Sequence, residues 1–160
     1  MENQFLIQKA AFADADKVVY LIISLLEELN MTLKQKFEFD FEQYTKLAEK
    51  SLGNENIFNA FLAYDAQDPS DPIGIITLAS SYAIYNLGEF GTITEFYVVP
   101  EYRSKGLGAV LIEEAKKFCT AKKWKKLEVG APAEKNWPRT IAFYENNGFN
   151  KKGPKLRLDI

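Results

Sequence analysis

The sequence predicts a single mixed α/β domain, and three observations support this. First, the chain has 160 residues, 47% of them apolar, which suits one domain with one sizeable core. Second, short β-rich runs alternate with amphipathic segments of helical period along the chain. Third, no repeat, linker or low-complexity tract divides it, so residues 1–160 are expected to form one domain.

The first half of the chain predicts a strand, two helices and a second strand. Apolar residues at helical spacing between 18 and 29 indicate the first helix, capped by Asp14 or Asp16. Gly53 marks the end of the second helix. The expected elements are strands over 5–10 and 57–64, helices after residue 14 and over 41–52, and an Asp- and Pro-rich turn over 65–72.

The second half begins with two β-rich runs, which predict an antiparallel hairpin joined around residues 86–88. Pro138 near a helix start and Gly148 after its end bracket the last helix. The expected elements are strands over 73–85 and 89–99, a helix over about 106–123, a strand over 124–131, a helix over 140–147, and closing strands from Phe149 and over 155–160.

Two features of the composition restrict the possible chemistry. The chain has no histidine, which excludes histidine-dependent catalytic triads and histidine-ligated metals. Cys119 is the only cysteine, so no intrachain disulfide or thiolate cluster can form. Its place within a predicted helix favours a small core residue over a nucleophile. Chemistry must come from carboxylates, tyrosines, backbone amides or a borrowed cofactor.

The charge and hydropathy patterns favour a cytoplasmic protein. A net charge of −2 argues against a nucleic-acid partner. The longest apolar stretch, residues 18–29, contains Ser24, Glu27 and Glu28 and is too short to cross a bilayer. The first ten residues lack the pattern of a signal peptide. We therefore expect neither a nucleic acid nor a membrane as partner.

The main functional signal is a strand–turn–helix pattern at residues 92–118. Pro100 has no N–H and ends strand pairing, and Arg103–Gly108 then lead directly into a helix. Glycines let the backbone approach a ligand, and the first helical turn offers unpaired N–H groups, which suit a phosphate. Taken alone, the glycine pattern favours an ordinary loop before a helix, and its spacing differs from the usual nucleotide-binding motifs.

The segment VVPEYRSKGLG and the helix after it resemble the acetyl-CoA-binding motif of the GCN5-related N-acetyltransferases (GNAT). The segment TIAFYENNGF at 140–149 resembles the tyrosine-bearing helix of the same family and its following strand. The resemblance covers nearly the whole chain. It implies a mostly antiparallel, twisted sheet that splays at the CoA site and is flanked by about four helices. It also implies direct transfer of acetyl from acetyl-CoA to a primary amine, without a metal.

The resemblance further implies a set of CoA contacts. Backbone groups of residues 96–98, near a bulge at Val98-Val99, would bond the pantetheine arm. The pyrophosphate would lie on the N–H groups of residues 104–109. Asn136 is one residue away from a common asparagine position and is equally suited to cap a helix. The expected residues are Phe96, Tyr97, Val98, Val99, Arg103, Ser104, Lys105, Gly106, Leu107, Gly108, Ala109, Asn136 and Tyr144.

Two residues are candidates for catalysis. The family places a tyrosine where Tyr144 stands, as the proton donor to the leaving thiolate; the alternative is a core tyrosine. Polyamine-type members carry Glu-Asp where this chain has Thr94-Glu95. Because adjacent strand residues face opposite sides, Glu95 does not simply inherit the base role. It could line the acceptor site, act through a water, or be a paired surface carboxylate.

The resemblance implies that the acceptor is an amine of a small molecule or a peptide. Several acids could form a wall that attracts a polyamine or diamine, although they also fit an ordinary acidic surface. These acids are Glu27, Glu28, Glu38, Asp40, Glu42, Glu89 and Glu95. The rival functions are a non-catalytic acyl-CoA-binding module and a structural domain without a ligand. Because dimers are common in the family, the resemblance also suggests a homodimer.

Overall fold

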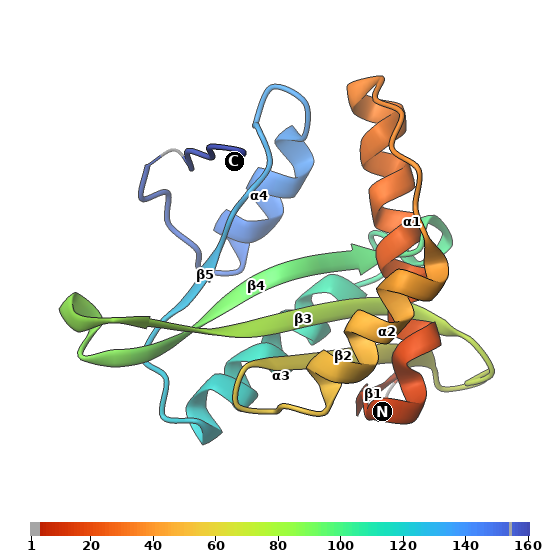
Figure 1. Ribbon diagram of the computed structural model, residues 1–160, viewed down its shortest axis with the longest axis horizontal. Helices are drawn as coiled ribbons and strands as arrows, with labels where there is room; N and C mark the ends of the chain where they lie inside the picture. The colour runs from red at the N-terminus through yellow and green to blue at the C-terminus, as the bar shows by residue number, and fades with distance from the viewer. Residues whose placement is uncertain (1–3, 154) are drawn as a thin grey trace.

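A computed structural model describes residues 4–153 and 155–160. Five strands form one sheet in the order β1-β2-β3-β4-β5, flanked by helices, as the mixed α/β prediction requires (Figure 1). The first four strands pair antiparallel, whereas β5 runs parallel to β4. The elements are β1 (Phe5–Lys9), α1 (Ala15–Leu33), α2 (Phe41–Leu52), β2 (Phe58–Asp65), β3 (Pro72–Ala83), β4 (Gly88–Val98), α3 (Leu107–Ala121), β5 (Leu127–Val129) and α4 (Pro138–Asn146), with short 3-10 turns at Phe12–Asp14, Ile84–Asn86 and Pro100–Tyr102.

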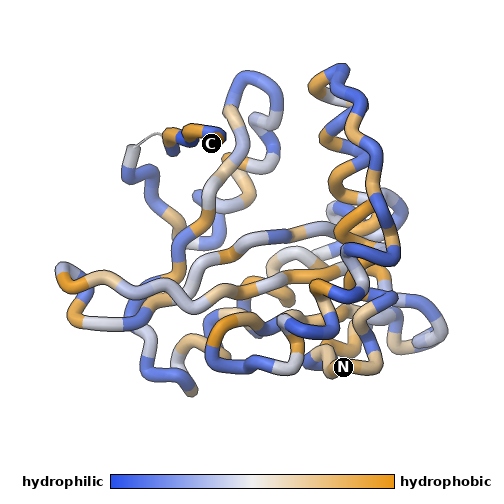
Figure 2. The backbone as a smooth tube through the Cα atoms, in the orientation of Figure 1, coloured by the Kyte–Doolittle hydropathy of each residue, from blue (hydrophilic) through white to orange (hydrophobic). Residues whose placement is uncertain are grey.

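The two faces of the sheet are covered by different helices. Alternate residues of a strand point to opposite faces. Phe61 and Ile76 therefore pack in the cluster that contains α3, while Leu62 and Ile75 pack in the cluster that contains α1 and α2. Figure 2 shows polar and apolar positions interleaved along α1, as expected for a helix with one apolar face. Each large side chain buried in these layers contributes roughly 1.5–3 kcal/mol.

The boundaries of α2 agree with the prediction for a local reason. Asp40 precedes the helix, and its carboxylate accepts a hydrogen bond from the backbone N–H of Gln43 at 3.1 Å. This bond satisfies one of the unpaired donors in the first turn. The helix then ends at Leu52, immediately before Gly53, as expected.

Strand β5 is shorter than expected and lies very close to β4. The prediction covered residues 124–131, but only Leu127–Val129 form the strand. A Cβ on Gly91 of β4 would meet Leu127 Cδ1 at 3.0 Å and Cys119 Sγ at 3.1 Å, so the glycine permits this approach. Cys119 is buried, and burial raises the pKa of its thiol to about 11, as befits a core residue.

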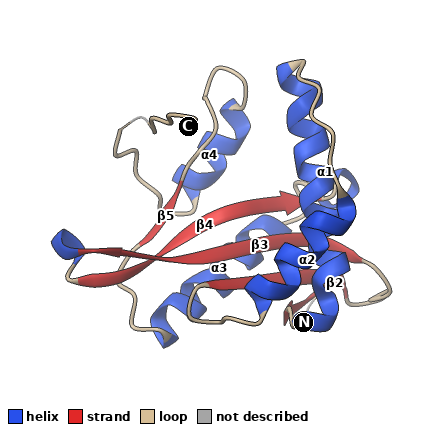
Figure 3. Ribbon diagram, viewed as in Figure 1, coloured by secondary structure: helices blue, strands red, loops and turns tan. Residues whose placement is uncertain are grey.

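The predicted closing strands are wrong. In the described residues after α4, the chain forms a loop without strand pairing (Figure 3). Leu156, Leu158 and Ile160 alternate as a strand would, yet all three are exposed. Alternation favours a strand only where one face has a surface to bury against, and these side chains have none. Phe149 does pack, edge to face against Tyr144 with ring centroids 5.4 Å apart.

Candidate active site

A cavity of about 930 Å³ is lined by α1, β4, the end of β5, the turn before α3, and α4. In Figure 1, α1 and α4 both project beyond the edge of the sheet that β4 borders. The cavity therefore joins segments from both halves of the chain. Helix α1 contributes Leu25, Glu28 and Leu29 to its wall.

The sheet splays where it borders this cavity. Strands β4 and β5 pair only from Gly91 with Leu127 to Ile93 with Val129. Beyond Ile93, β4 continues to pair with β3 on one side, and its residues 96–98 line the cavity together with Val129 at the end of β5 and Gly130 after it. The free edge can bond an extended ligand as an added strand would. The resemblance described above implied this splay.

A bulge lies in β4 at Thr94 and Glu95, not at Val98-Val99 as predicted. The register between β3 and β4 shifts here, so that both residues lie across from Thr77. A bulge sets two residues of one strand against one of its partner and re-aims their side chains. Alternation in β4 therefore breaks at this point, and the two side chains reach the same hydroxyl.

Thr77 is fully buried and joins these two residues. The backbone N–H of Glu95 donates to Thr77 Oγ1 at 2.8 Å, and the Thr77 hydroxyl donates to the Glu95 carboxylate. The Thr94 hydroxyl donates to the same carboxylate at 2.8 Å. Thr94 lines the cavity, whereas Glu95 does not. The Thr94 oxygen also lies 2.7 Å from Thr77 Oγ1, and it keeps a second lone pair that can accept a hydrogen bond.

The turn before α3 presents free backbone donors. Gly106 caps the helix at a φ of 88°, in the left-handed region that favours glycine, and a Cβ there would meet nothing within 4 Å. The N–H of Val110 is the first to bond within the helix, to the Gly106 carbonyl at 3.2 Å. The N–H groups of the preceding helical residues have no intrahelical partner. With the positive end of the helix dipole, they form a cradle suited to phosphate.

Gly108 serves helix packing as well as the cavity. A Cβ on Gly108 would meet Cε2 and Cζ of Phe143 at 3.0 Å. The Phe143 ring in turn stacks on Phe96 of β4, with centroids 5.5 Å apart and planes 16° apart. The glycine thus lets α4 approach α3 closely, and Gly108 and Phe143 both line the cavity.

Arg103 binds α1 instead of standing free beside the glycine turn. Its two terminal nitrogens donate to the Glu28 carboxylate at 3.0 and 2.6 Å, and its Nε donates to the Val98 carbonyl at 2.9 Å. The hydrogen bonds to Glu28 raise the pKa of the guanidinium. The guanidinium also lies 5.5 Å from the centre of the Tyr97 ring. Arg103 therefore braces the turn against α1, a contact that the sequence did not predict.

Sequence reasoning missed Arg139, in the first turn of α4. Its terminal nitrogen donates to Ser104 Oγ at 3.2 Å, and both residues line the cavity. Within the described part of the chain, no carboxylate forms an ion pair with it. Lys105, which was expected to add charge, lies over the Tyr102 ring and does not line the cavity. The only sequence signal for Arg139 was the helix start marked by Pro138.

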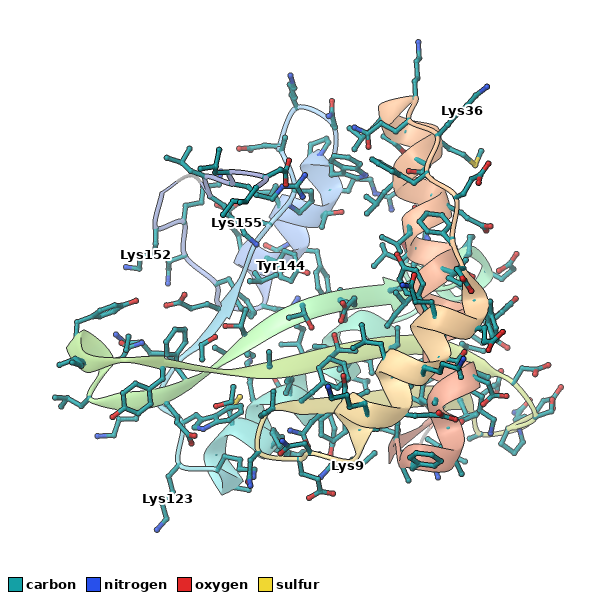
Figure 4. The ribbon with its side chains drawn as sticks, in the orientation of Figure 1. Lys9, Lys36, Lys123, Tyr144, Lys152 and Lys155 are labelled. Carbon is teal, nitrogen blue, oxygen red and sulfur yellow. The ribbon has the colours of Figure 1, made fainter. Side chains whose placement is uncertain are left out.

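Tyr144 lies between α4 and the splayed strands (Figure 4). Its side chain is 6% exposed and lines the cavity. Burial raises the pKa of the phenol to about 12, because the charged form is poorly solvated there. Among the described residues, none forms a hydrogen bond with its hydroxyl. The phenol thus keeps its proton at neutral pH and has it available for a ligand.

Most of the predicted CoA residues line the cavity. Those that do are Phe96, Tyr97, Val98, Arg103, Ser104, Gly106, Gly108, Ala109 and Tyr144. Val99, Lys105, Leu107 and Asn136 do not. Asn136 is exposed, and its side chain does not cap α4, which begins after Trp137. Trp137 and Asn147, at the two ends of that helix, line the cavity and were not predicted to bind CoA.

Of the two interpretations of these acids, the structure supports the ordinary acidic surface over the wall, because Glu28 is the one carboxylate among the described residues that lines the cavity. The other acids are spread over the surface because they lie on elements that face different ways. Glu27 and Glu38 border a separate hollow, Asp40 caps α2, Glu42 pairs with Lys46, Glu89 accepts from Trp124, and Glu95 bonds the two threonines.

Residues 4–153 and 155–160 contain no group of three or more His, Cys, Asp or Glu side chains placed to hold a metal ion. In the same residues, no helix combines the length and the apolar character needed to cross a membrane.

The family model described as an acetyltransferase (GNAT) domain matches residues 57–151, which include β4, the glycine turn and α4. The chain belongs to the GNAT family. No curated protein matches it in sequence. GNAT membership agrees with the splayed sheet, the helical cradle and the buried tyrosine described above.

Solved structures of GNAT enzymes share this fold. A ribosomal-protein-alanine N-acetyltransferase from Brucella melitensis biovar Abortus 2308 has 18% identity and a TM-score of 0.72, with 99% of this chain and 100% of that one covered. An aminoglycoside acetyltransferase from an uncultured soil metagenomic sample has 21% identity and a TM-score of 0.74, with 99% and 97% covered. A glucosamine-6-phosphate N-acetyltransferase from Arabidopsis thaliana has 17% identity and a TM-score of 0.74, with 98% and 99% covered. At these identities the likeness shows the fold alone.

Proposed function

We propose that this GNAT protein transfers the acetyl group of acetyl-CoA to a primary amine of a small molecule or a peptide. One observation carries the proposal: a single cavity combines the free edge of β4, the open helical cradle at Gly106 and the buried phenol of Tyr144. A structural domain would need none of these. A module that only binds acyl-CoA would need the first two but not the phenol.

The residues present fit acetyl-CoA. An open glycine cradle and unpaired N–H groups at the start of α3 suit the pyrophosphate. Arg139, with no ion-pair partner among the described residues, adds positive charge beside Ser104. The free backbone edge at residues 96–98 suits the amide-bearing pantetheine arm, although the Val98 carbonyl already accepts from Arg103. Bound acetyl-CoA supplies a thioester carbonyl that a neutral amine can attack.

The chain's own groups have distinct parts in this reaction. The Tyr144 phenol donates a hydrogen bond to the sulfur as negative charge develops on it. The Thr94 oxygen accepts an N–H of the incoming amine, because its own proton is held by Glu95. Glu95 is therefore a positioning residue that acts through Thr94. This replaces the role of a direct base that the sequence left open.

The test is the release of free thiol from acetyl-CoA with a panel of amines, together with the thermal shift that acetyl-CoA produces. A ligand that binds only the folded state stabilises it by RT ln(1 + [L]/Kd). We expect both a shift and amine-dependent thiol release. A thermal shift with acetyl-CoA but no thiol release would favour the acyl-CoA-binding module. The absence of a thermal shift would refute the proposed acetyl-CoA site.

A further inference from the structure

The charge of the cavity is unfavourable for a polycation. Among the described residues, the charged lining groups are Arg103, Arg139 and Glu28; Arg139 is assigned to the pyrophosphate above, which leaves the Arg103–Glu28 pair to face an acceptor. Both oxygens of the Glu28 carboxylate are bonded to Arg103. A polyamine or an aminoglycoside would enter a wall that offers no unpaired negative charge, and burying an uncompensated cation is costly.

Among the described residues, no side chain that lines the cavity is free to take a proton from an ammonium ion near neutral pH. Glu28 is paired with Arg103, and the Glu95 carboxylate lies behind Thr94. The other titratable lining groups are the phenols of Tyr97, Tyr102 and Tyr144, whose pKa values all lie above the ordinary value. The largest cause is burial for Tyr97 and Tyr144 and the hydrogen bond to Asp65 for Tyr102. The amine must therefore arrive already neutral.

This requirement separates two classes of amine. An α-amino group has a pKa of about 7.7–8.0, so roughly a tenth of it is neutral at pH 7. An alkyl ammonium has a pKa of about 10.4, so only roughly one molecule in 2,500 is neutral. A site without its own base favours the α-amine.

The wall beside the reacting position is apolar. Leu25 and Leu29 are four residues apart on α1 and so share one face of that helix. Phe96 from β4 and Trp137 at the start of α4 line the same cavity, and all four side chains are half-buried. An apolar group attached to the amine would remove this surface from water.

We propose that the acceptor is the α-amine of an apolar amino-acid residue, either in an amino-acid amide or at a peptide N-terminus. The inference rests on the acetyltransferase function proposed above. The nitrogen lone pair forms a C–N bond to the acetyl carbon while the C–S bond breaks and its electron pair stays on sulfur. The surplus proton of the amine passes to the sulfur or to water. The products are an N-acetyl amide and the free thiol of CoA.

Phenylalanine amide and phenethylamine provide a matched pair, because both carry the same ring and differ in the class of amine. At pH 7 and saturating acetyl-CoA, we expect kcat/KM to be at least tenfold higher for phenylalanine amide. The ratio of the two kcat/KM values should fall about tenfold for each pH unit between about 8 and 10. In this range the α-amine is already mostly neutral, whereas the neutral fraction of phenethylamine still rises about tenfold per pH unit. Spermidine and kanamycin should react more slowly than either. Leucine amide and the peptide Leu-Gly-Gly then distinguish the two sources of the α-amine.

A variant and a binding measurement complete the test. Leu29→Asp places a carboxylate in the apolar wall and should raise the ratio of spermidine to phenylalanine amide turnover at least tenfold. With CoA present, phenylalanine amide should raise the melting temperature of the unaltered protein, and spermidine should not. Equal kcat/KM for the matched pair at pH 7, or fastest turnover of a polycation, would overturn the inference. A thermal shift with acetyl-CoA but no acetylation of phenylalanine amide would overturn it too, whereas no shift with acetyl-CoA would instead refute the proposed function.

Discussion

Replacing Tyr144 with phenylalanine separates the chemistry of the site from its packing. The pKa of this phenol is about 12, whereas a thiol has a pKa near ~8.5, so complete proton transfer to the thiolate is unfavourable by roughly 5 kcal/mol. The hydroxyl is therefore expected to stabilise the leaving sulfur by a hydrogen bond. A hydrogen bond to a charged group contributes about 1.5–3 kcal/mol, which corresponds to a roughly 10- to 150-fold fall in kcat for Tyr144→Phe.

The same substitution should leave the fold and the acetyl-CoA site intact. The ring contacts with Phe96 and Phe149 do not need the hydroxyl, so the free energy of unfolding should change by less than about 0.5 kcal/mol. The assay is thiol release at saturating acetyl-CoA, with urea unfolding and acetyl-CoA titration alongside it. Tyr85→Phe, at the exposed end of the β3–β4 hairpin, is the control and should change neither quantity. An unchanged kcat in Tyr144→Phe would refute the hydrogen-bond argument.

Three other substitutions test separate parts of the structure. Gly108→Ala forces a Cβ to within 3.0 Å of the Phe143 ring. The free energy of unfolding in urea should therefore fall by about 1–3 kcal/mol, and acetyl-CoA should bind more weakly. An unchanged free energy of unfolding would show that α4 can shift to accommodate the methyl group. Glu95→Gln should lower kcat/KM less than tenfold and leave its pH profile unaltered, and loss of the alkaline limb would instead identify Glu95 as the base. Burial raises the Cys119 pKa from 9.0 to about 11, so the unfolded thiol ionises first and the free energy of unfolding should fall as the pH rises from 9 to 11. In Cys119→Ala the free energy of unfolding should fall less steeply between pH 9 and 11. The same steepness in both proteins would contradict the attribution of this fall to the Cys119 thiol.

The sequence was most informative where structure depends on neighbouring residues. The boundaries of α2 follow from its cap and its period, and the glycine turn follows from the residues between Pro100 and α3. The family motif then located the cavity, because it spans the turn and α4. These features need no knowledge of distant contacts.

Features that depend on distant partners could not be predicted. Arg103 finds Glu28 across 75 residues, and Arg139 reaches Ser104 from another helix. The bulge sets Thr94 and Glu95 against Thr77 of the adjacent strand, whose hydroxyl bonds to both residues. The prediction of closing strands was wrong because it relied on the local pattern alone. Residues 155–160 alternate as a strand would, but their side chains are exposed and have no surface to pack against.

The most direct test of the central claim is calorimetric titration of acetyl-CoA into the unaltered protein and two glycine variants. Gly106 and Gly148 both have positive φ values, 88° and 91°, and open space around the Cβ position, but only Gly106 lines the cavity. Valine strains the backbone at either position, so the two variants are matched for this cost. We predict that acetyl-CoA binds the unaltered protein and Gly148→Val with similar affinity, and binds Gly106→Val at least tenfold more weakly. No binding to the unaltered protein, or equal affinity in both variants, would contradict the account.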